Sequence, residues 1–239
     1  MATRYQHPVE LVNRVLRNST CSKVRAVTTT STSRSGRGRR STRPSGDDRE
    51  AAILATAERL LADKKFADIS VDDLARGAGI SRPTFYFYFA SKDAVLLALL
   101  QPLIQQADTG FDGAMEALPS DPRRAFREGI RTFFTAFGSH SVVARAGTEA
   151  IAGSTDVRAV WSTFMAKWIT QTASLIEFER ARGAAPDTIP AHDLATSLNL
   201  MNERAMTATL VAEDGAVAQD RIVETLAHIW LTSIYGDSQ

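Results

Sequence analysis

The chain has 239 residues, 44% of them hydrophobic, and a formal net charge of +1, so it can bury a sizeable core in one or two domains. The one cysteine, Cys21, excludes an internal disulfide or a cysteine-rich metal site, and the four histidines lack ligand spacing. No run of about eighteen apolar residues and no apolar N-terminal signal core occur. We therefore expect a cytoplasmic protein with no membrane partner, metal or cofactor.

Residues 1–46 are predicted to form a disordered basic arm. Within them, residues 1–43 contain ten Lys/Arg and one acid, a net charge of +9, whereas the remainder of the chain carries −8. The arm is rich in Ser, Thr, Arg and Gly and poor in large apolar residues, so it cannot bury enough apolar surface to fold alone.

Residues 47–107 begin with a predicted helix over 48–63 and continue into a predicted helix-turn-helix. Ser70 precedes acids and an apolar stripe, as a helix N-cap does, and a glycine-containing turn follows. Ser81 caps the next helix, with Pro83 in its first turn, where the missing N–H costs nothing. Two short helices joined by such a turn are typical of the motif whose second helix enters the DNA major groove.

Five consecutive aromatic residues, Phe85 to Phe89, admit either a strand or a helix. Aromatic runs favour β structure, but N-caps and a proline flank this run and no second strand candidate lies nearby. On a helix, Phe85 and Phe89 are one turn apart and face inward. Tyr86, Phe87 and Tyr88 then lie on the other sides, which leaves two phenol hydroxyls for phosphates. We therefore predict a helix.

The segment resembles the DNA-binding domain of TetR-type transcriptional repressors through the pattern Ser81-x-x-Thr84-x-Tyr86-x-Tyr88-Phe89-x-Ser91-Lys92-Asp93. A closer resemblance, to one group within this family, runs from about residue 44 to residue 236 and includes GISRPTFYFYF, LNLMNER and HIWLTSIYG. Residues 1–30 have no counterpart in it, and a wrongly chosen start codon is one hypothesis for them.

The resemblance implies an all-α fold of about nine helices. Its expected parts are a helix-turn-helix DNA-binding domain at 47–107 and a ligand-binding and dimerisation domain at 108–239. The expected partners are double-stranded operator DNA and a second copy of the chain, joined through the last two helices, 191–211 and 217–235.

The leading edge of the second helix of the motif is expected to enter the groove. Arg82 could bind guanine through two parallel hydrogen bonds or bind a phosphate, and the sequence leaves both open. Pro83 and Thr84 offer apolar contact to thymine methyl groups.

Other polar side chains of this region are expected to bind the DNA backbone. Tyr86 and Tyr88 match positions from which family members contact it, while Lys92 and Ser70 lie near helix N-termini that can hold a phosphate. The full set of expected DNA contacts is Ser70, Ser81, Arg82, Pro83, Thr84, Tyr86, Phe87, Tyr88 and Lys92.

The charge of the folded part predicts a role for the basic arm. Residues 47–107 have seven basic and nine acidic residues, an unfavourable balance for binding a polyanion. We therefore expect the arm to supply phosphate or minor-groove contacts, although a solvated linker is the alternative. The arginines closest to the first helix are Arg34, Arg37, Arg39, Arg40 and Arg43.

The rest of the chain is predicted to be helical throughout. Pro102 interrupts the fourth helix and is expected to bend it, as a hinge or as a kink that packing tolerates. Helix breaks are predicted at 118–122, 138–139, 153–154, 183–190 and 213–215, and the segments between them show no strand alternation.

Aromatic and amide side chains recur at helical spacing in this part of the chain. Trp161, Met165, Trp168 and Thr172 lie on one continuous helix face, and two amides follow three residues apart on a Leu/Met-rich helix. An ordinary bundle core is the alternative, but buried amides need hydrogen-bond partners. Ile130, Phe133 and Phe137 form a second aromatic face, Met206 follows the amides on their helix, and Trp230 lies in the last apolar helix. The resemblance implies many of the same positions and adds Phe126 and Glu203. The expected ligand-binding residues are Phe126, Ile130, Phe133, Phe137, Trp161, Met165, Trp168, Thr172, Asn199, Asn202, Glu203, Met206 and Trp230.

These features together predict a repressor that a hydrophobic or amphiphilic small molecule releases from DNA. The resemblance implies that a neighbouring flavin-dependent monooxygenase gene is regulated. The alternatives are a helical lipid- or amphiphile-binding protein and a DNA-binding activator without a physiological inducer. An enzyme is not expected, because the chain contains no phosphate-binding loop, dinucleotide fingerprint or H-E-x-x-H motif.

Overall fold

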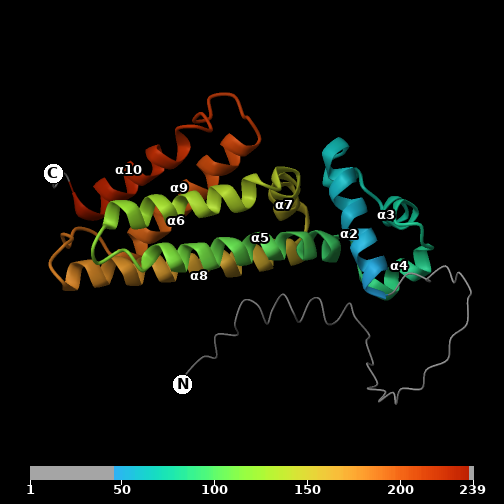
Figure 1. Cartoon of the computed structure of the whole chain (residues 1–239), viewed down its shortest axis with the longest axis horizontal. Helices are drawn as coiled ribbons and strands as arrows, with labels where there is room; N and C mark the ends of the chain where they lie inside the picture. Colours follow the sequence, from blue (N-terminus) through green and yellow to red (C-terminus); the bar gives the residue numbers. More distant parts are fainter. Residues whose placement is uncertain (1–45, 237–239) are drawn as a thin grey trace, which may run out of the picture.

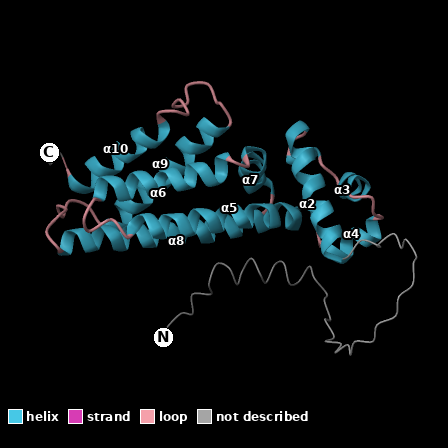
Figure 2. Ribbon diagram, viewed as in Figure 1, coloured by secondary structure: helices cyan, strands magenta, loops and turns pink. Residues whose placement is uncertain are grey.

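The computed structural model of the chain describes residues 46–236, and the basic arm predicted at 1–46 lies almost entirely outside them. These described residues form nine α-helices and one 3-10 helix, without a strand (Figures 1 and 2). The all-helical expectation is confirmed. The helices are α2 (Gly46–Asp63), η1 (Phe66–Asp68), α3 (Val71–Gly77), α4 (Arg82–Tyr88), α5 (Lys92–Met115), α6 (Pro122–Gly138), α7 (Ser141–Gly153), α8 (Thr155–Ala181), α9 (Ala191–Leu210) and α10 (Ile222–Tyr235).

The helices of the predicted helix-turn-helix begin at the expected caps. The Ser70 hydroxyl accepts from the backbone N–H of Asp73, and the Asp73 carboxylate accepts from Ser70 in return, which makes a complete capping box. The Ser81 hydroxyl accepts from the N–H of Thr84 at the start of α4. Between the helices, Gly79 has a φ of +68°, a conformation in which a side chain would be strained.

The aromatic run forms α4, and its packing corrects one sequence expectation. Phe85 and Phe89 are 0% and 2% exposed and pack inward, as predicted, whereas Tyr86 and Phe87 are exposed. Tyr88, expected on the outer surface, is only 8% exposed and joins the core. The helix has seven residues and ends at Tyr88, which lies three residues after Phe85 and therefore shares its inward face.

The 24-residue helix α5 connects the two ends of the molecule (Figure 1). It continues through Pro102 and across residue 107, so the predicted domain boundary falls inside a helix rather than in a linker. One hydrophobic core extends from Ile53 on α2 and Phe85 on α4, past α5, to Trp168 on α8. The DNA-binding helices therefore share their core with the C-terminal domain.

Polar contacts reinforce the same junction between α2, α5 and α7. The Arg145 guanidinium donates to the Leu61 carbonyl at 2.6 Å, near the C-terminal end of α2. The Ser154 hydroxyl, which follows α7, donates to the Asp93 carboxylate at 2.6 Å in the first turn of α5. These bonds cross between segments that are distant in sequence and fix α7 against the base of the helix-turn-helix.

A second core packs α9 and α10 against α6 and α8. The α10 helix begins at Ile222, later than the predicted residue 217, because residues 211–221 form a loop. The Thr209 hydroxyl donates to the Val217 carbonyl at 2.9 Å and holds that loop. The predicted start was therefore wrong by five residues.

A buried carboxylate connects the ends of α8 and α10. Glu179 is 0% exposed, and it accepts from Arg182 and from the Tyr235 hydroxyl. Burial raises the pKa of Tyr235 above its ordinary value, so this phenol is a stable donor.

Among residues 46–236, no single helix is long and apolar enough to cross a membrane. Only α4 and α5 taken together, as a pair bent by 44°, have the length and composition of a span.

The burial pattern of α4 predicts that Phe85→Ala lowers the free energy of unfolding by about 3–5 kcal/mol, because a fully buried ring is lost. Phe87, which is 62% exposed, is the matched control, and Phe87→Ala should change stability by less than about 0.5 kcal/mol. Urea denaturation of the two variants measures the difference. Equal losses would contradict the inward and outward assignment.

Candidate nucleic-acid interface and ligand pocket

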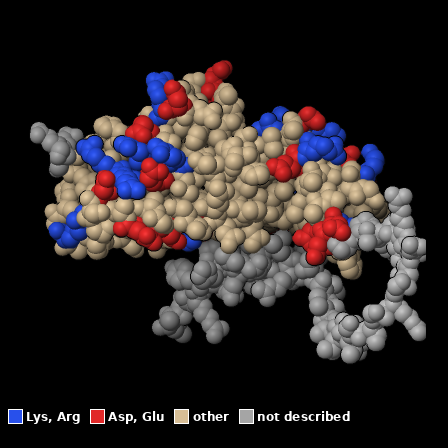
Figure 3. All heavy atoms as spheres, viewed as in Figure 1, with Lys and Arg blue, Asp and Glu red and all other residues tan. Residues whose placement is uncertain are grey.

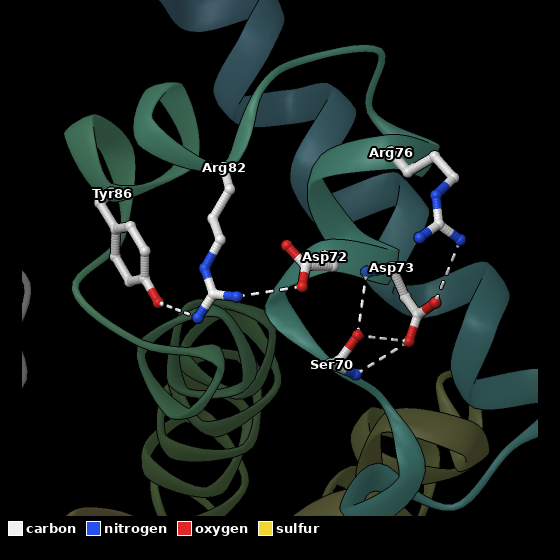
Figure 4. Close-up of polar contacts among 6 residues, drawn as sticks. All are labelled: Ser70, Asp72, Asp73, Arg76, Arg82 and Tyr86. Atoms are coloured by element: carbon white, nitrogen blue, oxygen red, sulfur yellow. Dashed lines mark hydrogen bonds and ion pairs between the residues drawn. The ribbon is translucent and has the colours of Figure 1, made fainter.

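Arg82 and Tyr86 lie on the exposed face of α4 and are joined to α3 (Figure 4). Arg82 Nη1 donates to Asp72 Oδ2 at 3.0 Å, and Nη2 donates to the Tyr86 hydroxyl at 3.3 Å. The hydrogen bond to the Tyr86 hydroxyl, and to a smaller extent the negative charge of Asp72, raise the pKa of Arg82 above its ordinary value. The guanidinium therefore has a defined orientation on the surface where DNA contacts are expected.

The hydroxyls of the two cap serines form hydrogen bonds with other residues of the protein. Ser70 Oγ donates to Asp73 Oδ2 at 2.6 Å, and this hydrogen bond is the main cause that lowers the pKa of Asp73. Ser81 Oγ lies 2.8 Å from the Thr84 hydroxyl. Both serines are exposed, and Pro83 and Phe87 lie on the same open surface. DNA contacts by Ser70, Ser81, Arg82, Pro83, Thr84, Tyr86, Phe87 and Tyr88 remain predictions.

Lys92 has a different environment from the one expected of a phosphate ligand. Its ammonium donates to the backbone carbonyls of Phe66, Ala67 and Ile69 at 2.9, 3.1 and 2.9 Å. It also lies 4.7 Å from the centre of the Phe66 ring. Because an ammonium has three N–H donors, all of them are used within the protein. In this geometry Lys92 holds the end of η1 against the start of α5, and its contact with a phosphate remains a prediction.

The surface charge around the DNA-binding helices is mixed. In the view of Figure 3, blue and red side chains both occur at the end of the molecule that carries α2 to α4. This pattern agrees with the excess of acids over bases in residues 47–107. Within the described part of the chain, no group of three or more His, Cys, Asp or Glu side chains could hold a metal ion.

A large pocket lies in the C-terminal domain. It contains about 1090 Å³ of space free of protein atoms, including the part open to solvent. All thirteen side chains expected to bind a ligand lie in its wall: Phe126, Ile130, Phe133, Phe137, Trp161, Met165, Trp168, Thr172, Asn199, Asn202, Glu203, Met206 and Trp230. The sequence prediction therefore identified one continuous cavity surface, and ligand binding by these residues remains a prediction.

Aromatic rings in edge-to-face contact form much of this wall. Trp168 stands perpendicular to Phe133, with ring centres 4.7 Å apart, and also contacts Trp161 at 5.8 Å. The Trp168 indole donates to Asp108 at 2.6 Å, which fixes the ring from outside the pocket. Such a rigid aromatic surface suits a long apolar ligand.

The polar groups of the pocket come mainly from α9. Trp230 Nε1 donates to Asn202 Oδ1 at 2.8 Å, and because an indole nitrogen only donates, this contact sets the orientation of the Asn202 amide. The Asn202 amide nitrogen has no hydrogen-bond partner among the described residues, so its two N–H groups are available to a ligand. Asn199 Nδ2 instead donates to Thr172 and to a backbone carbonyl. Burial raises the pKa of the nearby Glu203 carboxyl.

Sequence reasoning missed the walls that α5 and α7 contribute. The missed residues include Leu97, Leu100 and Ile104 on α5, and Gly147 and Ile151 on α7. Their apolar spacing is the same as that of an ordinary helix core, so no local signal could separate pocket wall from core.

Comparisons with known proteins agree with both regions. The family model described as bacterial regulatory proteins, tetR family, matches residues 53–99, and the model of the EthR C-terminal domain matches residues 126–236. The HTH-type transcriptional regulator EthR of Mycolicibacterium smegmatis is 67% identical over 210 residues, which cover 88% of this chain and 97% of that protein. EthR of Mycobacterium tuberculosis is 59% identical over 204 residues, covering 85% and 94%.

A crystal structure of a TetR-family regulator from Syntrophomonas wolfei superposes with a TM-score of 0.64, covering 79% of this chain and 95% of that one at 18% identity. This likeness concerns the fold alone. With the capped helix-turn-helix and the helical domain behind it, the identities show that the chain belongs to the TetR family of bacterial transcriptional regulators, as an EthR-like DNA-binding regulator and not an enzyme.

Proposed function

We propose that the protein is a repressor that binds operator DNA as a homodimer and is released by a hydrophobic or amphiphilic small molecule. The observation that carries this proposal is the double role of α5. Leu97, Leu100 and Ile104 line the pocket, while the first residues of the same helix pack in the core that supports α4. A change in the pocket wall therefore acts on the helix that follows the recognition helix.

The release mechanism is a shift between two arrangements of the dimer. Binding of two recognition helices in successive major grooves requires a separation of about 34–36 Å. A ligand that fits better when α5 and α7 are displaced favours an arrangement with a different separation. Equal affinity for both arrangements would produce no release, so the ligand must prefer the non-binding one.

The homodimer is proposed to form through α9 and α10. Leu200 on α9 is 51% exposed, an unusual state for a large apolar side chain in the middle of a helix. Partly buried Val223, Ile229 and Leu231 on α10 add to the apolar character of these two helices. The last two helices of family members build such an interface, which supports the same assignment here.

The chemistry of the pocket defines the ligand class. Its wall is mostly aromatic and aliphatic, and the available amide N–H groups of Asn202 are hydrogen-bond donors. A long apolar ligand with one carbonyl or amide oxygen satisfies both features. The family resemblance supports, as the regulated target, a neighbouring flavin-dependent monooxygenase gene.

The phosphate contacts of this regulator are proposed to come largely from the basic arm. Residues 47–107 carry more acids than bases, and Lys92 already donates to three carbonyls. The +9 charge of residues 1–43 would supply the missing attraction to DNA.

The function is tested by a mobility-shift titration of the full chain on a duplex from the intergenic region upstream of its gene. We expect a retarded complex that N-dodecylacetamide, an apolar chain with one amide, dissolves in a concentration-dependent manner. A complex insensitive to any apolar amide or ester would favour an activator or a repressor without inducer. Binding of the amphiphile without DNA binding would favour a lipid-binding protein.

Replacing the pocket amide should separate ligand response from DNA binding. In Asn202→Leu the ligand loses a hydrogen bond of about 1 kcal/mol, so the half-maximal concentration of N-dodecylacetamide should rise roughly fivefold while DNA affinity stays the same. Ser162→Ala, at an exposed position of α8 that lies outside the pocket wall and the proposed dimer helices, is the control. An unchanged response of a folded Asn202→Leu variant would remove Asn202 from the ligand site.

The role of Lys92 is tested by the salt dependence of DNA binding. We expect Lys92→Met to lower the free energy of unfolding by roughly 2 kcal/mol, because three charge-assisted hydrogen bonds are lost. The slope of log K against log salt should not change, whereas two lost phosphate contacts per dimer would reduce it by about 1.8.

Lys65→Met, at an exposed lysine nearby, is the control for stability, and deletion of residues 1–43 is the positive control that should flatten the slope. A reduced slope in Lys92→Met would restore Lys92 as a phosphate ligand.

A further inference from the structure

An acidic side chain lies within the surface that is expected to face DNA. Asp72 on α3 and Arg82 on α4 are ten residues apart in sequence and form an ion pair at 3.0 Å. Their side chains are 51% and 56% exposed, so the pair is open to a macromolecular partner. A carboxylate in this position repels the phosphates of DNA. The affinity of the protein for DNA therefore does not explain why Asp72 is present.

Two hydrogen bonds orient the Arg82 guanidinium and leave some of its N–H donors available. Asp72 accepts from Nη1 and Tyr86 accepts from Nη2, so each terminal nitrogen has one bond within the protein. The carbon of the guanidinium lies 5.8 Å from the centre of the Tyr86 ring, which adds a third contact. Of the five N–H donors of arginine, three remain available. A group held at two nitrogens loses little freedom when it meets a further acceptor.

The charge of the pair favours one of the two roles that the sequence left open for Arg82. An arginine that neutralises a phosphate needs a net positive charge, but the Asp72–Arg82 pair has none. A phosphate that approached Arg82 would also approach the Asp72 carboxylate. The major-groove edge of guanine presents two neutral acceptors, O6 and N7, and does not meet this repulsion.

We infer that Asp72 is a specificity-determining positioning residue, which holds the Arg82 guanidinium for two hydrogen bonds to a guanine edge and disfavours phosphate as an alternative acceptor. This inference rests on the proposed operator binding and adds which base type Arg82 binds. Asp72 thus lowers affinity for DNA in general and raises the preference for one base. Tyr86 supports the same orientation from α4 itself.

The experiment measures sequence preference directly. The full chain and its variants are equilibrated with duplexes that have a randomised core, and the bound fraction is sequenced to give relative affinities at each position. We expect the parent to select a G·C pair at one position in each half-site, and Arg82→Ala to lose at least about fivefold of this preference.

Asp72→Asn should reduce the guanine preference by about twofold to fivefold, the range expected for loss of an exposed ion pair. It should also bind the bulk of the pool at least as tightly as the parent, because a negative charge is removed. Asp68→Asn is the matched control, since Asp68 is an exposed acid on the neighbouring η1 and does not pair with Arg82. It should leave the guanine preference unchanged. Thermal melts show that each variant is folded.

Three results would overturn the inference: an unchanged guanine preference in Asp72→Asn, an unchanged preference in Arg82→Ala, or a parent that binds the pool without selecting guanine. A parent that binds no duplex at all would instead refute the proposed function, so the two failures are distinguishable.

Discussion

The packing of α5 is the constraint on which the other features of the molecule depend. Val95 and Leu96 are 1% exposed and belong to the core beneath the helix-turn-helix, and Leu100 and Ile104, one to two turns later, face the pocket. A close-packed helix cannot change its position at one end and keep every contact at the other. The DNA-binding helices and the pocket are therefore joined by one continuous helix, without a separate linker.

Two cationic side chains of the DNA-binding region, Arg82 and Lys92, have partners within the protein. The exposed guanidinium of Arg82 is neutralised by Asp72, and the ammonium of Lys92 is consumed by backbone carbonyls. Both cations stabilise or orient the folded surface. Under the proposed mode of binding, such a region contributes more to the choice of DNA sequence than to the attraction of DNA, and the strongly basic segment immediately before α2 supplies the attraction.

The wall of the pocket is mostly apolar, and its two amides have different hydrogen-bond partners. The Trp230 indole can only donate, so its bond to Asn202 leaves the amide N–H groups, and not the carbonyl, available to a ligand. The Asn199 amide nitrogen donates to Thr172 and to a carbonyl of its own helix. Two amides three residues apart therefore have different roles, and the difference arises from their partners on α8 and α10.

Local signals in the sequence were sufficient for most of the fold. The caps at Ser70 and Ser81 form within three residues, and the helical spacing of Trp161, Met165 and Trp168 placed them on one face of the pocket. The family resemblance alone supplied only Phe126 and Glu203 among the pocket positions. Helix caps and helix faces depend on hydrogen bonds between residues close in sequence and on the spacing of apolar residues over a few turns, both of which can be read from the sequence.

The partners of Lys92 and the walls from α5 and α7 were decided by the tertiary structure alone. Lys92 reaches carbonyls 23 to 26 residues away. Tyr88, in contrast, faces inward because it lies three residues after Phe85 on the same helix, a relation that the sequence spacing already contained. Whether an apolar or cationic side chain meets core, cavity or partner depends on which distant segments pack against it, and one-dimensional periodicity does not contain that information.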